Sequence, residues 1–157
     1  MDYPEKDLTE KIIGAAIAVH KYWGPGLIES VYEKSLAREL ELQGVEHKRQ
    51  VDLKLEYKGA EVGDGLRLDL IVEGKVVVEL KVVKDFDPVH EAQLLTYMRI
   101  TGCKVGLLIY FNTPTLINGV KRFFNLCVSV PSVVKNPQNY TKTNVFSFFR
   151  EGCPVSS

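Results

Sequence analysis

Two neighbouring segments of the chain carry charged residues inside runs that are otherwise apolar. They are LRLDLIV (66–72) and VVVELKVV (76–83). Apolar runs of this length are typical of buried strands, and they fall well short of the ~20 residues that a membrane-spanning helix needs. A charge in a buried strand is costly unless a partner or a bound cation offsets it. Asp69, Glu79 and Lys81 therefore indicate either a functional site or a neutralised network inside a sheet.

The register of the hairpin between these two strands decides whether the charges meet. A loop over 73–75 pairs Val72 with Val76 and places Asp69 opposite Glu79. A loop shorter by one residue puts the two carboxylates on opposite faces, because successive side chains of a strand alternate between faces. We expect the longer loop, since it gathers the buried charges in one place.

Alternation along the first strand assigns the neighbouring side chains to faces. Arg67 shares a face with Asp69, and Leu68 and Leu70 point to the other face. In the expected register Lys81 falls opposite Arg67. Two interpretations stay open at this point. Two carboxylates within reach of each other form a site for a hard cation such as Mg²⁺. Alternatively, the two cations neutralise the carboxylates in a purely structural network.

The rest of the pattern divides into helices and strands. Apolar residues at helical spacing predict helices over 7–22, 28–43 and 88–101. Asp7 and Glu10 read as a capping pair for the first helix. Apolar or alternating runs predict strands over 51–57, 66–72, 76–83, 104–111 and 119–126. The order ααβββαββ predicts an α/β fold with a mixed central sheet flanked by helices.

Composition and charge narrow the class of protein. Hydrophobic residues make up 45% of the chain and charged residues 25%, which excludes a disordered or fibrous protein. A chain of 157 residues suits one domain, which we place at 1–130, followed by an irregular C-terminal extension at 131–157. Lys plus Arg and Asp plus Glu balance at 20 each, so nucleic-acid binding needs a local basic surface.

Cysteine usage and the N-terminal segment indicate the compartment. Three cysteines without a CxxC pair argue against a zinc site and suit a reducing cytoplasm. The charged segment 1–10 lacks a signal-peptide core, so we expect a cytoplasmic protein that does not enter a membrane. The oligomeric state stays open, with a homodimer as one option. The apolar side chains of Phe146, Phe148 and Phe149 cover either this subunit's core or a partner's.

A second polar pair lies on the helix expected at 88–101. Gln93 and Tyr97 are four residues apart and share one helix face, whereas Leu94 and Met98 supply the core side. Beside a metal site, an amide and a phenol can orient water or phosphate. The alternative is an ordinary solvated polar face.

The motifs together resemble the PD-(D/E)XK nuclease superfamily. Asp69, then Glu79-Leu80-Lys81, then Gln93 and Tyr97 follow the superfamily's order, and the QxxxY spacing is similar to its RecB and lambda-exonuclease branch. The segment GLIESVY (26–32) matches the motif of the GxxExxY family. Further segments look like that family's in the same order: IIGAAIAVHKYWGPGLIESVYE, YKG, RLDLIV, VELK, HEAQLLTYM and GLLIYFN. The resemblance spans about Leu8 to Arg122.

This resemblance implies a restriction-endonuclease-like core and a nuclease that depends on Mg²⁺ or Mn²⁺. By motif, Asp69 and Glu79 are metal ligands and Lys81 is the catalytic lysine. Catalytic roles are further implied for three residues that match the other motifs, namely Glu29, Gln93 and Tyr97. The implied partner is DNA, with RNA the less favoured alternative. A rival hypothesis is a non-catalytic nucleic-acid-binding or regulatory module with the same fold.

The roles of four residues depend on where their side chains lie. Glu29 lies in the first turn of a helix, where a carboxylate can simply complement the helix dipole; the resemblance favours a metal or water-positioning role instead. Arg67 is a phosphate-contact candidate if its strand faces the site. His90 lies one helical turn before Gln93, and Lys84 belongs to a basic rim, so we expect both to contact nucleic acid.

Overall fold

A five-stranded mixed sheet forms the centre of the computed structural model, which describes residues 2–63 and 65–125. In the order of the sheet, the strands are β1 (His47–Leu53), β4 (Leu66–Val72), β5 (Val76–Lys81), β6 (Val105–Tyr110) and β7 (Val120–Phe124). Strands β5 and β6 are parallel, and the other neighbours are antiparallel. The predicted mixed sheet flanked by helices is therefore confirmed.

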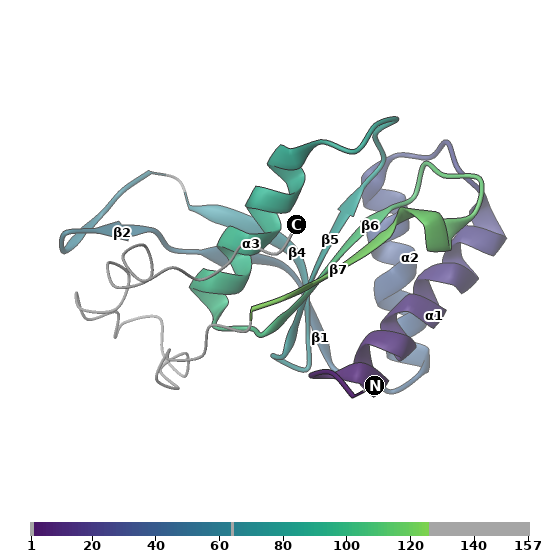
Figure 1. Cartoon of the computed structure of the whole chain (residues 1–157), viewed down its shortest axis with the longest axis horizontal. Coiled ribbons are helices and arrows are strands. Elements are labelled where there is room, and N and C mark those ends of the chain that lie inside the picture. Colours follow the sequence, from purple (N-terminus) through teal and green to yellow (C-terminus); the bar gives the residue numbers. More distant parts are fainter. Residues whose placement is uncertain (1, 64, 126–157) are drawn as a thin grey trace.

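Helices cover both faces of this sheet (Figure 1). The hairpin of α1 (Lys6–Trp23) and α2 (Glu29–Leu42) packs on one face, where it buries an apolar core with alternate residues of β4, β5 and β6. Helix α3 (Pro88–Thr101) packs on the other face through Leu94, Tyr97 and Met98. Among the described residues, no helix is long and apolar enough to cross a membrane.

Several predicted boundaries need correction. The strand expected at 51–57 begins at His47 and ends at Leu53, because its pairing with β4 starts at His47 opposite Val72. A separate short hairpin follows, made of β2 (Glu56–Tyr57) and β3 (Ala60–Glu61), and a 3-10 turn η1 (Leu116–Gly119) precedes β7. The expected capping pair is wrong, since α1 begins at Lys6 and already includes Asp7, with no side-chain cap at Glu5.

The C-terminal assignments fall beyond the part of the chain that the structure describes. Strand β7 ends at Phe124, within the predicted 119–126. The expected extension at 131–157 and its apolar residues lie outside the described residues.

The predicted hairpin register is confirmed, and it leads to a fork in the sheet. Val72 pairs with Val76 and Leu70 with Val78, and the β4–β5 ladder ends there. The β1–β4 ladder continues as far as Leu66, while the β5–β6 ladder continues as far as Lys81. In Figure 1 the wing of β1 and β4 with the β2–β3 hairpin extends away from the wing of β5, β6 and β7. Asp69 and Glu79 lie at the start of this fork.

The expected common face of Leu68 and Leu70 on β4 is wrong. Leu70 packs in the core under α1 and α2, whereas Leu68 packs in the cluster under α3, so the two leucines do not share a face. Gln50 and Asp69 lie opposite each other in the β1–β4 ladder but do not pair. The backbone of Gln50 has a φ of 49°. A left-handed residue is uncommon in a strand and interrupts its alternation. Strand β1 is thus interrupted at Gln50, opposite Asp69, which is the residue between the two leucines that point to different faces of β4.

Candidate active site

Asp69 connects the two sides of the fork. Its Oδ2 atom accepts a hydrogen bond of 2.9 Å from the backbone N–H of Leu80, at the point where the β4–β5 ladder has ended. The side chain is buried, and burial is the main reason why the pKa of Asp69 is raised. The bond from Leu80 and the charge of Lys81 act in the opposite direction. The carboxylate thus replaces a ladder bond and stays between the two strands.

Glu79 is the most deeply buried acidic group of the site. Only 2% of the residue is exposed, and its Oε2 atom has no hydrogen-bond partner among the described residues. Burial and then repulsion by Asp69 raise the pKa of Glu79 to about 8, although Lys81 lowers it. The Nζ atom of Lys81 lies 3.7 Å from Oε1, which makes a loose ion pair. A buried carboxylate oxygen without a donor is rare. The Asp69 carboxyl lies within hydrogen-bonding reach of Glu79, but the two groups can bond to each other only when they share a proton. With both groups ionised, Oε2 calls for a further partner.

Glu29 reaches the same cluster from the start of α2. Burial raises its pKa, the charge of Lys81 lowers it, and the charges of Asp69 and Glu33 raise it further. The turn before α2 fixes this position. Gly26 has a φ of 106°, which favours glycine, and the buried Tyr32 hydroxyl accepts from the backbone N–H of Leu27 and donates to the carbonyl of Gly24. The predicted helix start thus delivers a carboxylate to the fork.

Glu33 is a supporting residue whose role the sequence left undecided. It is buried, and its two carboxylate oxygens accept hydrogen bonds from Arg49 Nε at 2.8 Å and Gln50 Nε2 at 2.6 Å. These bonds attach α2 to β1 at the break opposite Asp69. Gln50 is not among the residues that the sequence pattern indicates. A single polar residue in an edge strand gives little signal, because its importance depends on a helix that lies 17 residues earlier.

Tyr97 and Gln93 approach the fork from α3. Gln93 Nε2 donates to the Tyr97 hydroxyl at 2.8 Å, and that hydroxyl donates to the backbone carbonyl of Arg67 at 3.1 Å. Tyr97 is buried, and its pKa is raised by burial and by the charge of Glu79. The alternative of a solvated polar face is therefore wrong for this pair.

The three expected phosphate contacts lie outside this cluster. The Arg67 side chain is exposed and forms an ion pair of 2.7 Å with Asp52 on β1, so it does not face Lys81. The expected structural network between Arg67 and the buried carboxylates is thus not formed. His90 Nδ1 lies 3.1 Å from the Tyr110 hydroxyl, next to the site. Lys84 is exposed in the segment that follows β5.

The charge balance of the fork fits a bound cation. Glu29, Glu33, Asp69 and Glu79 together face the cations Lys81 and Arg49. Within the described ranges, no group of three or more His, Cys, Asp or Glu residues is suitably placed to hold a metal. One or two carboxylates are enough for Mg²⁺, because water and substrate phosphate usually complete its coordination. The unpaired Oε2 of Glu79 beside Asp69 therefore meets the chemical requirement.

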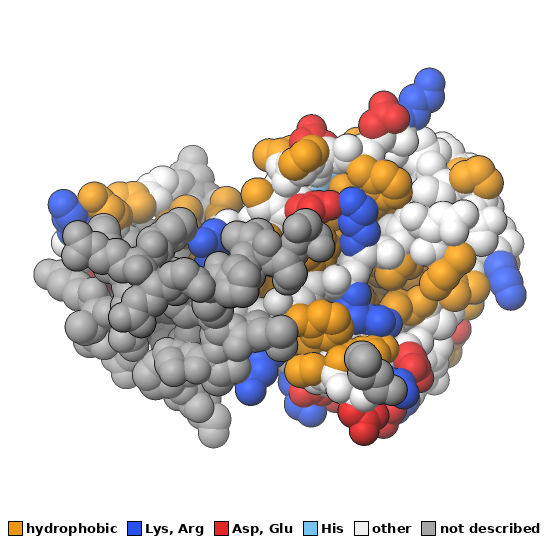
Figure 2. All heavy atoms as spheres, in the orientation of Figure 1, with side chains coloured by type: hydrophobic (Ala, Val, Ile, Leu, Met, Phe, Trp, Pro, Cys, Tyr) orange, Lys and Arg blue, Asp and Glu red, His pale blue; other side chains and the backbone are white. Residues whose placement is uncertain are grey.

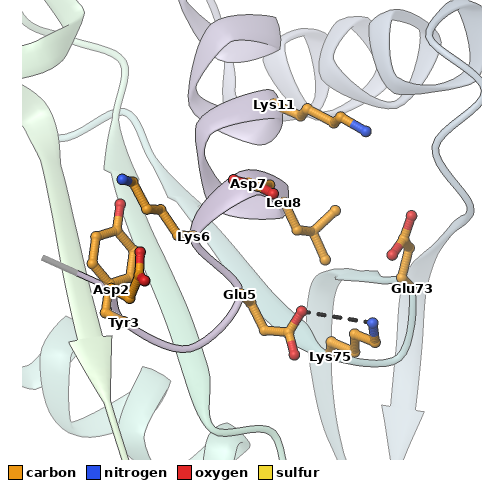
Figure 3. Close-up of a pocket in the computed structure, with 9 residues that line it drawn as sticks. All are labelled: Asp2, Tyr3, Glu5, Lys6, Asp7, Leu8, Lys11, Glu73 and Lys75. Carbon is orange, nitrogen blue, oxygen red and sulfur yellow. Dashed lines mark ion pairs between the residues drawn. The ribbon is translucent and has the colours of Figure 1, made fainter.

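A separate cavity lies at the other end of the sheet, and it does not resemble a cation site. Its volume is about 440 Å³, and Figure 3 shows that it lies between the start of α1 and the β4–β5 turn. Its charged lining mixes both signs, and Lys75 forms an ion pair with Glu5 across it. The cavity adjoins the turn before β5, whereas Lys81 is the last residue of β5. The cavity is therefore distant from the fork.

Comparison with known proteins gives one match. A family model described as the PD-(D/E)XK nuclease superfamily matches residues 6–123. Searches of curated proteins and of solved structures found no match. The matched range includes the whole fork, from Glu29 on α2 to Tyr97 on α3.

Proposed function

This chain belongs to the PD-(D/E)XK nuclease superfamily, and on that premise we propose that it is a metal-dependent nuclease that hydrolyses phosphodiester bonds in DNA. The observation that carries the proposal is the buried pair of Asp69 and Glu79, with one oxygen unpaired among the described residues and Lys81 alongside. Within the superfamily we place the chain in the GxxExxY family, because residues 26–32 carry its motif. Residues 1–130 form the nuclease domain in this proposal, and 131–157 an extension.

Asp69 and Glu79 are the residues that would hold Mg²⁺ or Mn²⁺. Such a cation polarises a phosphate oxygen and lowers the pKa of bound water. For the binding to occur, Glu79 must give up the proton that its pKa of about 8 favours at neutral pH. The loose ion pair with Lys81 then helps to hold the carboxylate in its charged form.

Four other residues contribute to the reaction in this proposal, two by contact with substrate or water and two by positioning. Lys81 is largely buried, so its ammonium group is pre-placed to offset the charge that grows on the phosphate in the transition state. Glu29 is half-buried with a raised pKa, which suits a residue that holds a water molecule and accepts its proton. Gln93 and Tyr97 fix α3 against β4 and orient polar groups toward the fork.

Nucleic-acid contacts outside the fork are proposed for the residues named above. Arg67, His90 and Lys84 come from β4, α3 and the segment between β5 and α3. Arg67 would exchange its surface pair with Asp52 for a phosphate, which is a small loss because exposed ion pairs contribute little. We further propose a cytoplasmic protein that acts on DNA in preference to RNA, with a homodimer as one option for its oligomeric state.

A cleavage assay with matched variants tests the function. The full chain is incubated with single-stranded DNA, duplex DNA and RNA, in Mg²⁺ or Mn²⁺ and separately in chelator. We expect metal-dependent cleavage that Asp69→Asn reduces by about 100-fold or more, because the variant removes a ligand charge while an oxygen remains to accept from Leu80. The control Asp52→Asn changes a carboxylate on the neighbouring strand and should retain cleavage.

The outcomes separate the proposal from its rival. Cleavage that is indifferent to chelator or to Asp69→Asn contradicts it. Nucleic-acid binding by a folded protein that never cleaves favours the non-catalytic binding module.

A further inference from the structure

Phe86 is an aromatic side chain held directly beside the fork. It belongs to the segment between β5 and α3, which starts where Lys81 ends its strand. Its ring makes an edge contact with Tyr110, with 4.4 Å between centroids and an interplanar angle of 87°. Tyr110 is the partner of Lys81 in the parallel β5–β6 ladder. Phe86 is therefore one side chain away from the proposed catalytic lysine.

The Phe86 ring is fixed by its neighbours yet remains accessible. The Nζ atom of Lys121 lies over the ring at 4.6 Å from its centroid, and Lys121 is itself paired with Glu91 on α3. His90 adds a further contact to Tyr110 beneath. In spite of these contacts, Phe86 is 49% exposed. An ordered aromatic surface loses little conformational entropy when a flat partner binds to it.

Exposed apolar side chains come from the segments on both sides of the fork. Ile28 directly precedes Glu29 on the other side of the fork and is 68% exposed. Val83 and Val89, each three residues from Phe86 in the sequence, are also exposed. Figure 2 shows hydrophobic side chains among charges of both signs over the end of the molecule where β5 meets α3. Duplex binding relies on rows of Lys and Arg that contact phosphates. Binding of unpaired strands instead combines a few cations with aromatic surfaces that stack on bases.

We propose that Phe86 is a stacking platform for a base of an unpaired strand, so that the substrate of this site is single-stranded DNA or an unpaired strand end. The inference rests on the proposed nuclease function and specifies its substrate class. Lys121, whose Nζ atom lies over one face of the ring, supplies the cation that accompanies a base stacked on the other face. A base inside a duplex is already stacked on its neighbours and cannot use such a platform.

Binding measurements on a cleavage-silent protein test the platform. The full chain carrying Asp69→Asn is titrated with a fluorescein-labelled oligothymidylate and with a labelled duplex of the same length. We expect preference for the single strand, and a loss of about five- to thirty-fold when Phe86→Leu is added, because leucine preserves apolar area without an aromatic face. Phe86→Trp should restore binding. Tyr57→Leu removes an aromatic side chain that is 57% exposed on the β2–β3 hairpin, and it should leave binding unchanged.

An abasic oligonucleotide identifies the base as the partner of the ring. The chain that retains Phe86 should bind the abasic strand more weakly than the strand with bases. On the abasic strand, Phe86→Leu should have almost no further effect on affinity. In the chain with Asp69 intact, Phe86→Leu should raise KM several-fold and leave kcat within about two-fold, since a platform binds substrate and transition state alike.

Two results overturn the inference while the proposed function survives. The first is cleavage together with an affinity for the single strand that Phe86→Leu leaves unchanged. The second is a preference for duplex that Phe86→Leu does not alter. Conversely, a Phe86-dependent preference for single strands without any metal-dependent cleavage supports the platform and contradicts the nuclease. Circular dichroism melting of each variant confirms that it is folded.

Discussion

At the scale of single residues, the fork between β4 and β5 carries more negative than positive charge, and two hydrogen bonds to Glu33 and one to Asp69 maintain the arrangement. Burial raises the pKa of Asp69, Glu79 and Glu29 in the same direction, because each charged form loses water and faces the other carboxylates. Such a cluster is destabilising when empty and favourable when a cation enters. The cluster is therefore more easily explained as a cation-binding site than as a structural network.

The substitution Asp69→Asn tests this explanation through stability. It removes one charge from beside Glu79 and leaves an oxygen that accepts from Leu80, so we expect the free energy of unfolding in chelator at about pH 8 to rise by roughly 1 kcal/mol. Urea unfolding followed by circular dichroism measures it. The control Asp52→Asn breaks only an exposed pair and should change stability little. A fall of several kcal/mol for Asp69→Asn would restore the structural-network hypothesis.

At the scale of secondary-structure elements, Gly106 allows α3 to approach the sheet. A Cβ atom at this position in β6 would lie 2.5 Å from Met98 Sδ and 3.1 Å from both methyl groups of Leu94. We expect Gly106→Ala to destabilise the protein by about 1–3 kcal/mol through overpacking. It should also reduce nuclease activity, because Tyr97 lies on the displaced helix and bonds to the carbonyl of Arg67.

Gly14→Ala is the matched control for this substitution. Gly14 is exposed on α1, and nothing lies within 4 Å of a Cβ atom built there. Alanine should stabilise the helix by up to about 1 kcal/mol and leave activity unchanged. Thermal unfolding and the cleavage assay compare the two variants. Equal effects at the two positions would show that the contact with Met98 and Leu94 does not place α3.

The same elements show what sequence could and could not predict. The loop over 73–75 sets the β4–β5 register locally, and α3 begins and ends as predicted because Asp87 caps it, Pro88 opens it and Gly102 ends it. The change of faces at Asp69 depends on distant contacts, since Gln50 is held by Glu33 from another element. No periodicity within β4 reports such a contact. This is why the sequence pattern could indicate the motif residues but not the partner of Arg67.

At the scale of the whole molecule, the fork connects stability to pH and to divalent cations. Glu79 has a pKa of about 8 in the folded chain and close to 4.5 when unfolded, so the folded state holds more protons between these values. Stability should therefore fall as pH rises from about 4.5 to about 8, with the raised pKa of Asp69 and Glu29 acting in the same direction. Above about pH 8 this contribution is constant.

Divalent cations should reverse that loss, because Mg²⁺ binds the deprotonated carboxylates and displaces their protons. We expect the rise in Tm on adding Mg²⁺ to be small near pH 5 and to increase up to about pH 8, where Glu79 no longer holds its proton. Differential scanning calorimetry across this range, with and without Mg²⁺, measures both effects. In Asp69→Asn, Glu79 loses the neighbouring charge that most strongly opposes its ionisation, so the pH dependence should flatten and the Mg²⁺ effect should disappear. A Mg²⁺-induced rise in Tm that is equal at all pH values, or that persists in Asp69→Asn, would mean that the cation binds elsewhere on the chain.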